Sequence, residues 1–403
     1  MLSVEEARDR ILNGVKPLAP IELPLLEAHG CVLAADVIAE YDLPPFSAAE
    51  TDGYALRAAD VHVASKDAPT TLRIVGEVTQ GRHPEATVGW GEAVRVESGA
   101  AVPAGADSVV PLDRCRVRDD AVAVLRGVEE GGFVTPAGRD VRAGDVLVPS
   151  GRRLSSPELA VLASAGRAAP PAYPKVRVAV LSIGDLVEPG RPVAFGQVRD
   201  VGSYGIYGAL RDAGAVPYRV GVVPDAESEV REAVLTNLAR ADCFVCTTGT
   251  DESLEADVLG ELADIELVQT AMRPGSHHGF GFVEGAPLFV LPRAPVSAFV
   301  IFEVLIRPAI LRMMARRDLR RPEVEAILDE DVDGSPEATS FVPARVDRGE
   351  GGWHARPSGP ADPELLHTVV DANGLIVVAP GAAERSAGAR VPVRLFRPLE
   401  RQA

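Results

Sequence analysis

Short, nearly continuous apolar runs alternate with helix-like segments between residues 176 and 315, and this alternation constrains the fold more than any other feature of the sequence. The run VRVAVLS (176–182) is typical of a parallel strand that is covered on both faces. Strands separated by helices at this spacing predict a doubly wound, three-layer α/β domain. The other predicted strands are 218–223, 243–248, 266–271, 279–283 and 287–292, and the predicted helices are 203–213, 226–240, 254–263 and 296–315.

Sheets of this kind bind ligands beyond the carboxyl ends of their strands. Four polar, glycine- or proline-containing loops follow the predicted strands and should lie at that edge. They are SIGDL (182–186), TTGTDES (247–253), AMRPGSHH (271–278) and LPRAP (291–295).

The segments that flank this domain have a different pattern. A capping box predicts a first helix from about Val4 to Leu12. Residues 41–135 contain short β-branched stretches between turns, which predicts a small β-rich domain. A capped helix that ends at Gly166 should follow, and residues 318–403 predict a small β-barrel.

Composition excludes several classes of protein. The chain has 58 acidic and 41 basic residues, a net charge of −17, which argues against nucleic-acid binding and against docking on an anionic membrane. No apolar stretch reaches the length of a membrane-spanning helix, and the acidic N-terminal segment does not resemble a signal peptide, so a cytoplasmic location is expected. Cys243 and Cys246 form a CxxC, but in a strand they should point to opposite faces, so we expect core residues rather than a metal site.

Seven segments of the chain are recognisable together and in order. They resemble the molybdopterin molybdenumtransferase family, which comprises bacterial MoeA, its plant homologue and the E domain of gephyrin. The segments are LPPFSAAETDGYALR (43–57), VRVESGAAVPAGADSVV (94–110), GRDVRAGDVLV (138–148), VLSIGDLVEPG (180–190), GQVRD (196–200), AMRPG (271–275) and LPRAPVSAFVIFEVLIRPAI (291–310).

The resemblance implies a multidomain α/β plus β fold, an elongated homodimer of four-subdomain chains. Subdomain I would combine residues 1–40 with 136–172, and the β-rich subdomain II would be residues 41–135. Subdomain III, the α/β domain, would be residues 173–317, and the β-barrel, subdomain IV, residues 318–403. In such dimers the cleft lies between subdomain III of one subunit and subdomain II of the other.

The resemblance also implies an activity, the insertion of molybdate into adenylated molybdopterin with release of AMP and participation of Mg²⁺. These substrates are anions, so their site needs backbone N–H groups, cations, and carboxylates for the metal. The residues that match the family's motifs fall into three groups. The expected catalytic carboxylates are Asp52, Asp140 and Asp257, the expected substrate-binding residues are Ser98, Gly249, Arg273, Pro292, Arg293 and Pro295, and the expected metal ligands are Asp185 and Asp225.

Each of these residues has a plainer interpretation. Asp52 could belong to an ordinary Asp-Gly turn, and Asp140 to an Asx turn. Asp185 and Asp225 could cap helices, and for Asp225 capping is the favoured interpretation. Asp257 could be a solvated helix residue, and the prolines could be purely structural.

Several pocket motifs depart from the family's pattern. Its glycine-rich TSGGVSVGD loop is here TTGTDESLEAD (247–257), with one glycine and added acidic residues. Leu186 replaces an acid, Ser276 replaces a lysine, and the family's LPGNP is LPRAP. Arg199, Arg273, Arg293, His277 and His278 could build a different anion site, although exposed loop residues are the favoured interpretation of the histidines.

Two functions therefore follow from the sequence. The first is the family's molybdenumtransferase activity. The second is a catalytically degenerate, gephyrin-like dimeric scaffold that binds a membrane-receptor tail or a tubulin-like protein near the III/IV dimer interface.

Gly202, Gly205 and Gly208 recur every three residues, which favours close helix packing over phosphate binding.

Overall fold

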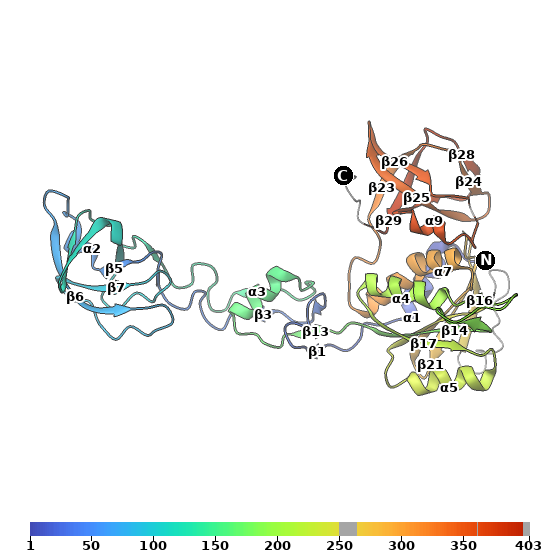
Figure 1. The fold of residues 1–403 in the computed structure, drawn as a ribbon, viewed down its shortest axis with the longest axis horizontal. Coiled ribbons are helices and arrows are strands. Elements are labelled where there is room, and N and C mark those ends of the chain that lie inside the picture. The colour runs from blue at the N-terminus through green and yellow to red at the C-terminus, as the bar shows by residue number, and fades with distance from the viewer. Residues whose placement is uncertain (250–263, 361, 398–403) are drawn as a thin grey trace. The chain divides into compact units, whose positions relative to one another are not determined.

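A computed structural model describes residues 1–249, 264–360 and 362–397, and Figure 1 shows the elements. The chain forms two compact units. The first comprises Met1–Glu22, Gly30–Ala34 and Pro171–Ala403, and the second comprises Leu23–His29 and Ala35–Pro170. The expected division into four subdomains stays a prediction.

The first unit is built on a six-stranded mixed sheet with the order β17-β14-β18-β22-β21-β19. The first four strands are parallel, which confirms the doubly wound α/β prediction, and the last two are antiparallel. The change of direction follows from Glu284 and Gly285, which form a two-residue hairpin turn with φ of 49° and 83°. The bounds are β14 Arg177–Ile183, β17 Val216–Val223, β18 Cys243–Thr247, β19 Asp264–Gln269, β21 His277–Val283 and β22 Ala286–Leu291.

Helices cover both faces of this sheet, so the three-layer expectation is also confirmed (Figure 1). One face packs against α1 (Val4–Gly14), α4 (Gly202–Ala213) and a long helical segment. This segment is α7 (Pro295–Ile301), a π-helical turn at Phe302–Ile306, and α8 (Arg307–Met313), where the sequence predicts one helix. The other face packs against α5 (Glu227–Asn237). The predicted helix 254–263 lies outside the described residues.

Helix α1 begins as predicted and packs on the α/β sheet. Ser3 Oγ accepts a hydrogen bond from the Glu6 amide at 3.2 Å, and the Ser3 amide donates to Glu6 Oε2 at 2.8 Å, which completes the capping box. Val4, Ala7 and Ile11 are buried in the same core cluster as the sheet residues of that face.

The C-terminal part of the first unit is a closed five-stranded barrel, as predicted. The strand order is β25-β26-β23-β29-β27, and β27 pairs back with β25, which closes the ring. The short strand β20 (Met272–Arg273) adds to the edge of β25 and so links the α/β domain to the barrel. The remaining bounds are β23 Glu323–Leu328, β24 Val332–Ser335, β25 Thr339–Gly349, β26 Gly352–Pro357, α9 His367–Val370, β27 Gly374–Val378, β28 Ala382–Arg385 and β29 Arg390–Leu395.

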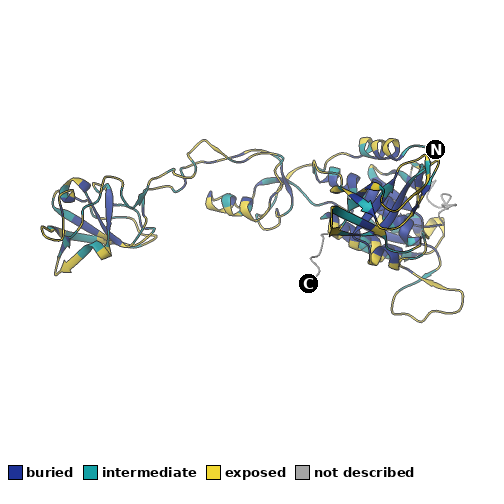
Figure 2. Ribbon diagram, turned by 90° about the horizontal axis from the view of Figure 1, so that it is seen from above, coloured by how far each residue is buried: buried dark blue, intermediate teal, exposed yellow. Residues whose placement is uncertain are grey.

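The second unit contains the predicted β-rich domain. Its sheet has the order β8-β5-β7-β6-β10-β9, and its buried valines and leucines appear as the dark strands in Figure 2. Helix α3 (Ser156–Ser164) is followed by Gly166 with φ of 70°, as its capped pattern predicts. The sheet strands are β5 Gly53–Leu56, β6 Thr70–Val78, β7 Glu92–Val96, β8 Ser108–Pro111, β9 Cys115–Arg118 and β10 Ala121–Val124, and the short elements are β3 Val37–Ile38, β4 Ala48–Ala49, α2 Ala58–Val61, β11 Val134–Thr135 and β12 Val146–Val148.

The CxxC lies inside the core. Cys243 packs on one face of the sheet and Cys246 on the other, as the alternation of a strand requires. Burial raises the pKa of both thiols, that of Cys246 to about 12, so neither is a thiolate near neutral pH. Among the helices of the described ranges, none is long and apolar enough to cross a membrane.

Candidate functional site

The carboxyl ends of β14, β18 and β22 bring three of the predicted loops together. Beyond the last paired residues, the Thr248 amide donates to the Leu291 carbonyl at 2.9 Å, and the Arg293 amide donates to the Gly249 carbonyl at 3.1 Å. The loops that follow β18 and β22 therefore continue side by side. Gly249 and Pro292 are both buried in this arrangement.

Arg293 reaches from its loop to the end of β14. Its Nη2 donates to the Ile183 carbonyl at 3.3 Å, while its Nε is buried and has no hydrogen-bond partner in the described part of the chain. Gly184 makes room for the guanidinium, because a Cβ there would lie 2.5 Å from Nη2. The chain thus presents an under-bonded cation at the edge where sheets of this type bind ligands.

A buried polar network supports this edge from below. The Asp200 carboxylate is fully buried and accepts hydrogen bonds from Ser182 Oγ at 2.8 Å and from the Ser203 amide at 3.1 Å. Ser182 in turn contacts Thr247 Oγ1 at 2.8 Å. The network therefore joins the ends of β14 and β18 to the first turn of α4.

Arg219, on β17, balances the charge of this network. Its Nη2 lies 2.9 Å from Asp200 Oδ2 and 2.9 Å from Glu188 Oε1, and its Nε donates to Ser203 Oγ at 2.7 Å. Burial lowers the pKa of Arg219, but the hydrogen bonds to the two carboxylates outweigh it, so the pKa is raised. Sequence reasoning missed this network: Asp200 lies in the recognised GQVRD segment, but no local pattern marks Arg219 or Glu188 as its partners.

The two expected metal ligands are exposed at this end of the sheet. Asp185 lies in a bend between β14 and β15 (Leu186–Val187), so the helix-cap interpretation of Asp185 is wrong. Asp225 precedes α5, but the N-cap position is Ala226 and has no side-chain cap, so the capping interpretation is wrong too. Across the described ranges, no three His, Cys, Asp or Glu side chains are grouped to hold a metal ion, and the assignment of Asp185 and Asp225 as metal ligands stays a prediction.

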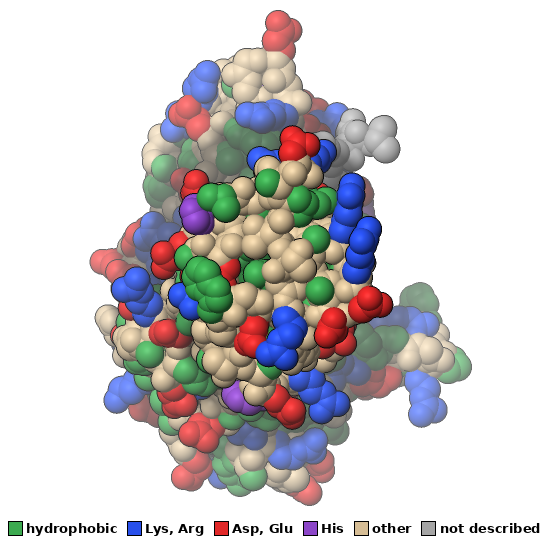
Figure 3. All heavy atoms as spheres, turned by 90° about the vertical axis from the view of Figure 1, so that its left-hand side faces the viewer, with side chains coloured by type: hydrophobic (Ala, Val, Ile, Leu, Met, Phe, Trp, Pro, Cys, Tyr) green, Lys and Arg blue, Asp and Glu red, His purple; other side chains and the backbone are tan. Residues whose placement is uncertain are grey.

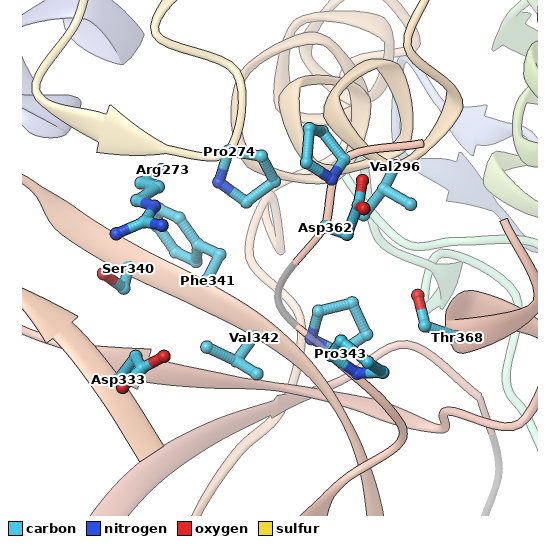
Figure 4. A pocket seen from close by; sticks show the side chains of 12 residues that line it. Arg273, Pro274, Val296, Asp333, Ser340, Phe341, Val342, Pro343, Asp362 and Thr368 are labelled. Atoms are coloured by element: carbon cyan, nitrogen blue, oxygen red, sulfur yellow. The ribbon is translucent and has the colours of Figure 1, made fainter. Parts of the chain in front are cut away.

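Arg273 lies on β20 and lines a cavity of about 250 Å³ between the α/β domain and the barrel. In Figure 4 its guanidinium lies beside Ser340 and Phe341, and Thr368 lies on the opposite side. Ser340 is buried and its hydroxyl has no hydrogen-bond partner among the residues described. The cavity therefore offers a cation and an unused hydroxyl against a mostly apolar lining.

Two further predictions about this region are wrong. His277 and His278 are not exposed loop residues: both lie on β21, and His278 is buried with its Nε2 2.9 Å from Thr270 Oγ1. Burial, with His277 nearby, lowers the pKa of His278 to about 4, so it supplies no cation near neutral pH. The three glycines of α4 also do not all pack closely against a neighbouring element, although their spacing predicts it. A Cβ at Gly202 would meet Thr247 Oγ1 at 2.9 Å, but none would meet anything within 4 Å at Gly205 or Gly208.

In the second unit, Asp52 and Ser98 are neighbours in space. Asp52 directly precedes β5, and its Oδ1 accepts a hydrogen bond at 2.8 Å from the amide of Ser98, which lies just beyond the end of β7. Ser98 Oγ donates to the Glu50 carbonyl at 3.2 Å. Gly53 must be glycine, because a Cβ there would lie 2.2 Å from the Val110 carbonyl oxygen.

Asp140 is exposed on a neighbouring loop of the same unit. Arg139 Nη1 contacts Glu50 Oε1 at 3.1 Å, which places this loop beside the segment that carries Asp52. The Asx-turn interpretation of Asp140 is wrong, since its side chain makes no hydrogen bond within the described part of the chain. Asp257 lies outside the described residues. Pro295 occupies the first turn of α7, where a proline is favoured.

The expectation that the protein does not bind nucleic acid stays a prediction. On the face turned to the viewer in Figure 3, acidic and basic side chains are interspersed. A basic face of the kind that exchanges for phosphate counterions is not seen there.

The fold and the loops at its sheet edge define a multidomain protein built on a molybdopterin-binding type of α/β domain. Three family descriptions match in order: "MoeA N-terminal region (domain I and II)" over residues 2–166, "Probable molybdopterin binding domain" over 179–312, and "MoeA C-terminal region (domain IV)" over 325–396. The chain belongs to the MoeA family.

Individual relatives agree with this assignment. The molybdopterin molybdenumtransferase 1 of Mycobacterium tuberculosis is 35% identical over 98% of both chains, and that of Bacillus subtilis is 28% identical over 98% of this chain and 94% of its own. The crystal structure of a MoeA protein from Pyrococcus horikoshii has a TM-score of 0.82 at 28% identity and covers 99% of this chain and 100% of its own.

Proposed function

We propose that the protein is a molybdopterin molybdenumtransferase of molybdenum cofactor biosynthesis, which inserts molybdate into adenylated molybdopterin and releases AMP. The observation that carries the proposal is the full-length similarity to proteins of that name, together with an under-bonded arginine at the ligand-binding edge of the α/β sheet. The relatives named above are molybdopterin molybdenumtransferases and a MoeA protein, which favours the transferase over the receptor or filament scaffold.

Individual residues of this chain would have the following roles in such a reaction. All the substrates are anions, so Arg293 and Arg273 would hold phosphate or molybdate oxygens by charge-assisted hydrogen bonds. Positioning and electrostatics supply most of the catalysis in phosphoryl chemistry, and Asp52, held by the Ser98 amide, is the proposed catalytic carboxylate. Asp140 and Asp257 are proposed to assist it. Pro292, Pro295 and Gly249 would shape the loop against the substrate.

Asp185 and Asp225, both exposed at the carboxyl end of the sheet, would hold Mg²⁺ together with oxygens of the bound substrate. A cytoplasmic, homodimeric protein remains our expectation.

The test is AMP release from adenylated molybdopterin by the purified full-length protein, with molybdate and Mg²⁺ supplied. We expect release by the wild type and a loss of at least about 100-fold in Asp52→Ala. Asp113→Ala, a change of another acidic residue in the same unit, should leave the rate unchanged. Folded wild-type protein that neither releases AMP nor binds the pterin would contradict the proposal.

A further inference from the structure

Five arginines gather where α1, α8 and the barrel meet, in a chain whose net charge is −17. Four of them, Arg8, Arg320, Arg321 and Arg394, line a small cavity of about 20 Å³, and the fifth, Arg307, lies next to it. We call this the arginine cavity. Of the described residues that line it, Glu303 is the one carboxylate, and apolar residues complete the wall.

Arg8 is the least satisfied member of the cluster. Its side chain is 7% exposed, yet the nearest carboxylates among the described residues are Glu5 at 3.9 Å and Asp9 at 3.8 Å, both more than 60% exposed. Neither distance is that of a hydrogen bond. A buried guanidinium with no close acceptor costs free energy that an incoming anion would recover.

The neighbouring charged groups do not compensate the positive charge of Arg8. Glu303 accepts two hydrogen bonds of 2.8 Å from Arg321, and Glu323, at 3.4 Å, is the one carboxylate that Arg394 contacts among the described residues. Burial lowers the pKa of Arg8, and Arg320 and Arg394 lower it further, against the opposite effect of Glu5 and Asp9.

Arg307 shows the same imbalance. Burial, followed by the charge of Arg321, lowers the pKa of Arg307 to about 10, although Glu303 acts in the opposite direction. Its Nε has no hydrogen-bond partner in the described ranges and lies 4.0 Å from Glu303. The buried Arg8 and the half-buried Arg307 are thus held close to other cations without full compensation in the described ranges.

We propose that the arginine cavity binds the head group of a small oxyanion, a phosphate or a carboxylate. The guanidinium of Arg8 would form its floor, with Arg321 and Arg394 at the sides and the exposed Arg320 at the rim. Guanidinium forks match the oxygens of both groups, and the apolar wall strengthens the interaction by excluding water. A cavity of this size admits about one water-sized group, so one oxygen of the oxyanion enters and the rest of the head group lies at the rim.

The experiment measures thermal unfolding of the full-length protein against rising sodium phosphate or sodium acetate, with sodium chloride at equal ionic strength as the reference. A ligand that binds the folded state raises Tm by mass action. We expect phosphate, acetate or both to raise Tm beyond chloride, and the larger shift identifies the head group. Calorimetric titration with inorganic phosphate gives the affinity.

Two variants and one control test whether the anion binds in the arginine cavity. Arg8→Gln should abolish the anion-dependent shift, and Arg320→Gln, at an exposed rim position, should weaken phosphate binding about tenfold without endangering the fold. Arg10→Gln is the matched control, because Arg10 lies on α1 but pairs with Glu266, outside the cavity. A shift retained in both cavity variants, or one that chloride reproduces at equal ionic strength, overturns the proposal. The readout is independent of transferase activity.

Discussion

Arg293 shows how a single replacement changes the chemistry of a loop. Its guanidinium lies at the carboxyl end of β14, where the family's pattern has a glycine, and among the described residues it makes one long hydrogen bond and leaves Nε unsatisfied. Backbone N–H groups crowd around an anion only where side chains leave room. Here the guanidinium of Arg293 fills that space, so the anion would be bound by its positive charge instead of by backbone N–H groups.

Arg293→Gln should therefore weaken substrate binding more than it slows the chemistry. We expect KM for adenylated molybdopterin to rise about tenfold, with a smaller change in kcat, in steady-state AMP-release assays. Arg293→Lys should recover part of the loss, and Arg211→Gln, an exposed position on α4, should have no effect.

Gly184 offers a second way to test the same geometry. Gly184→Ala puts a Cβ 2.5 Å from Arg293 Nη2 and should raise KM as Arg293→Gln does. The double variant should be no worse than either single one, because both act on one guanidinium. Additive losses would show that Gly184 has a separate role.

At the scale of elements, the Asp200 network holds the sheet edge together. One buried carboxylate receives hydrogen bonds from β14, from α4 and from Arg219 on β17. Removing one partner of such a pair leaves an uncompensated buried charge.

Asp200→Ala should cost about 3 kcal/mol in the stability of the α/β domain and lower its thermal midpoint by several degrees. Differential scanning calorimetry of the full chain measures this shift. Asp212→Ala, which removes an exposed carboxylate on α4, should change the midpoint by less than about 1 °C. Equal effects of the two variants would argue against the network.

Helix α3 carries a pH-dependent cap. Hydrogen bonds from Ser155 and Arg152 lower the pKa of Glu158 to about 2. Because the folded pKa lies below the unfolded value of about 4.3, this stabilisation is complete above pH 4.3 and is lost as pH falls toward 2. Glu158→Gln should lower the free energy of unfolding by about 1 kcal/mol at pH 7, and urea denaturation should show the difference from wild type shrinking between pH 4.3 and pH 2.

For the whole molecule, the expectation is a homodimer. The prediction comes from the resemblance to the family, and sedimentation equilibrium tests it directly. We expect a particle of twice the 42.4 kDa chain mass over the micromolar range. A monomer at these concentrations would contradict the prediction.

Much of the fold could be predicted because it depends on sequence patterns that act over a few residues. The apolar runs of the parallel strands, the capping box at Ser3 and the turn residues each act within a few neighbours in the chain. The antiparallel edge strands and the π-helical turn inside the predicted helix 296–315 could not be predicted from the sequence, because both depend on how segments pack. His278 illustrates this at the residue scale: a residue of an apparent loop became a buried strand residue.

By itself, the sequence determined the class of fold, the order of its parts and the loops that reach the carboxyl ends of the strands, because hydrophobic periodicity and turn chemistry act locally. Only the tertiary structure decided which charges meet. Asp200 finds Arg219, Arg293 reaches past Gly184, and Arg8 joins arginines more than 300 residues away without enough carboxylates to balance them. The reason is physical: the energy of a charge depends on its burial and on its neighbours in space, and neither can be read from its neighbours in the chain.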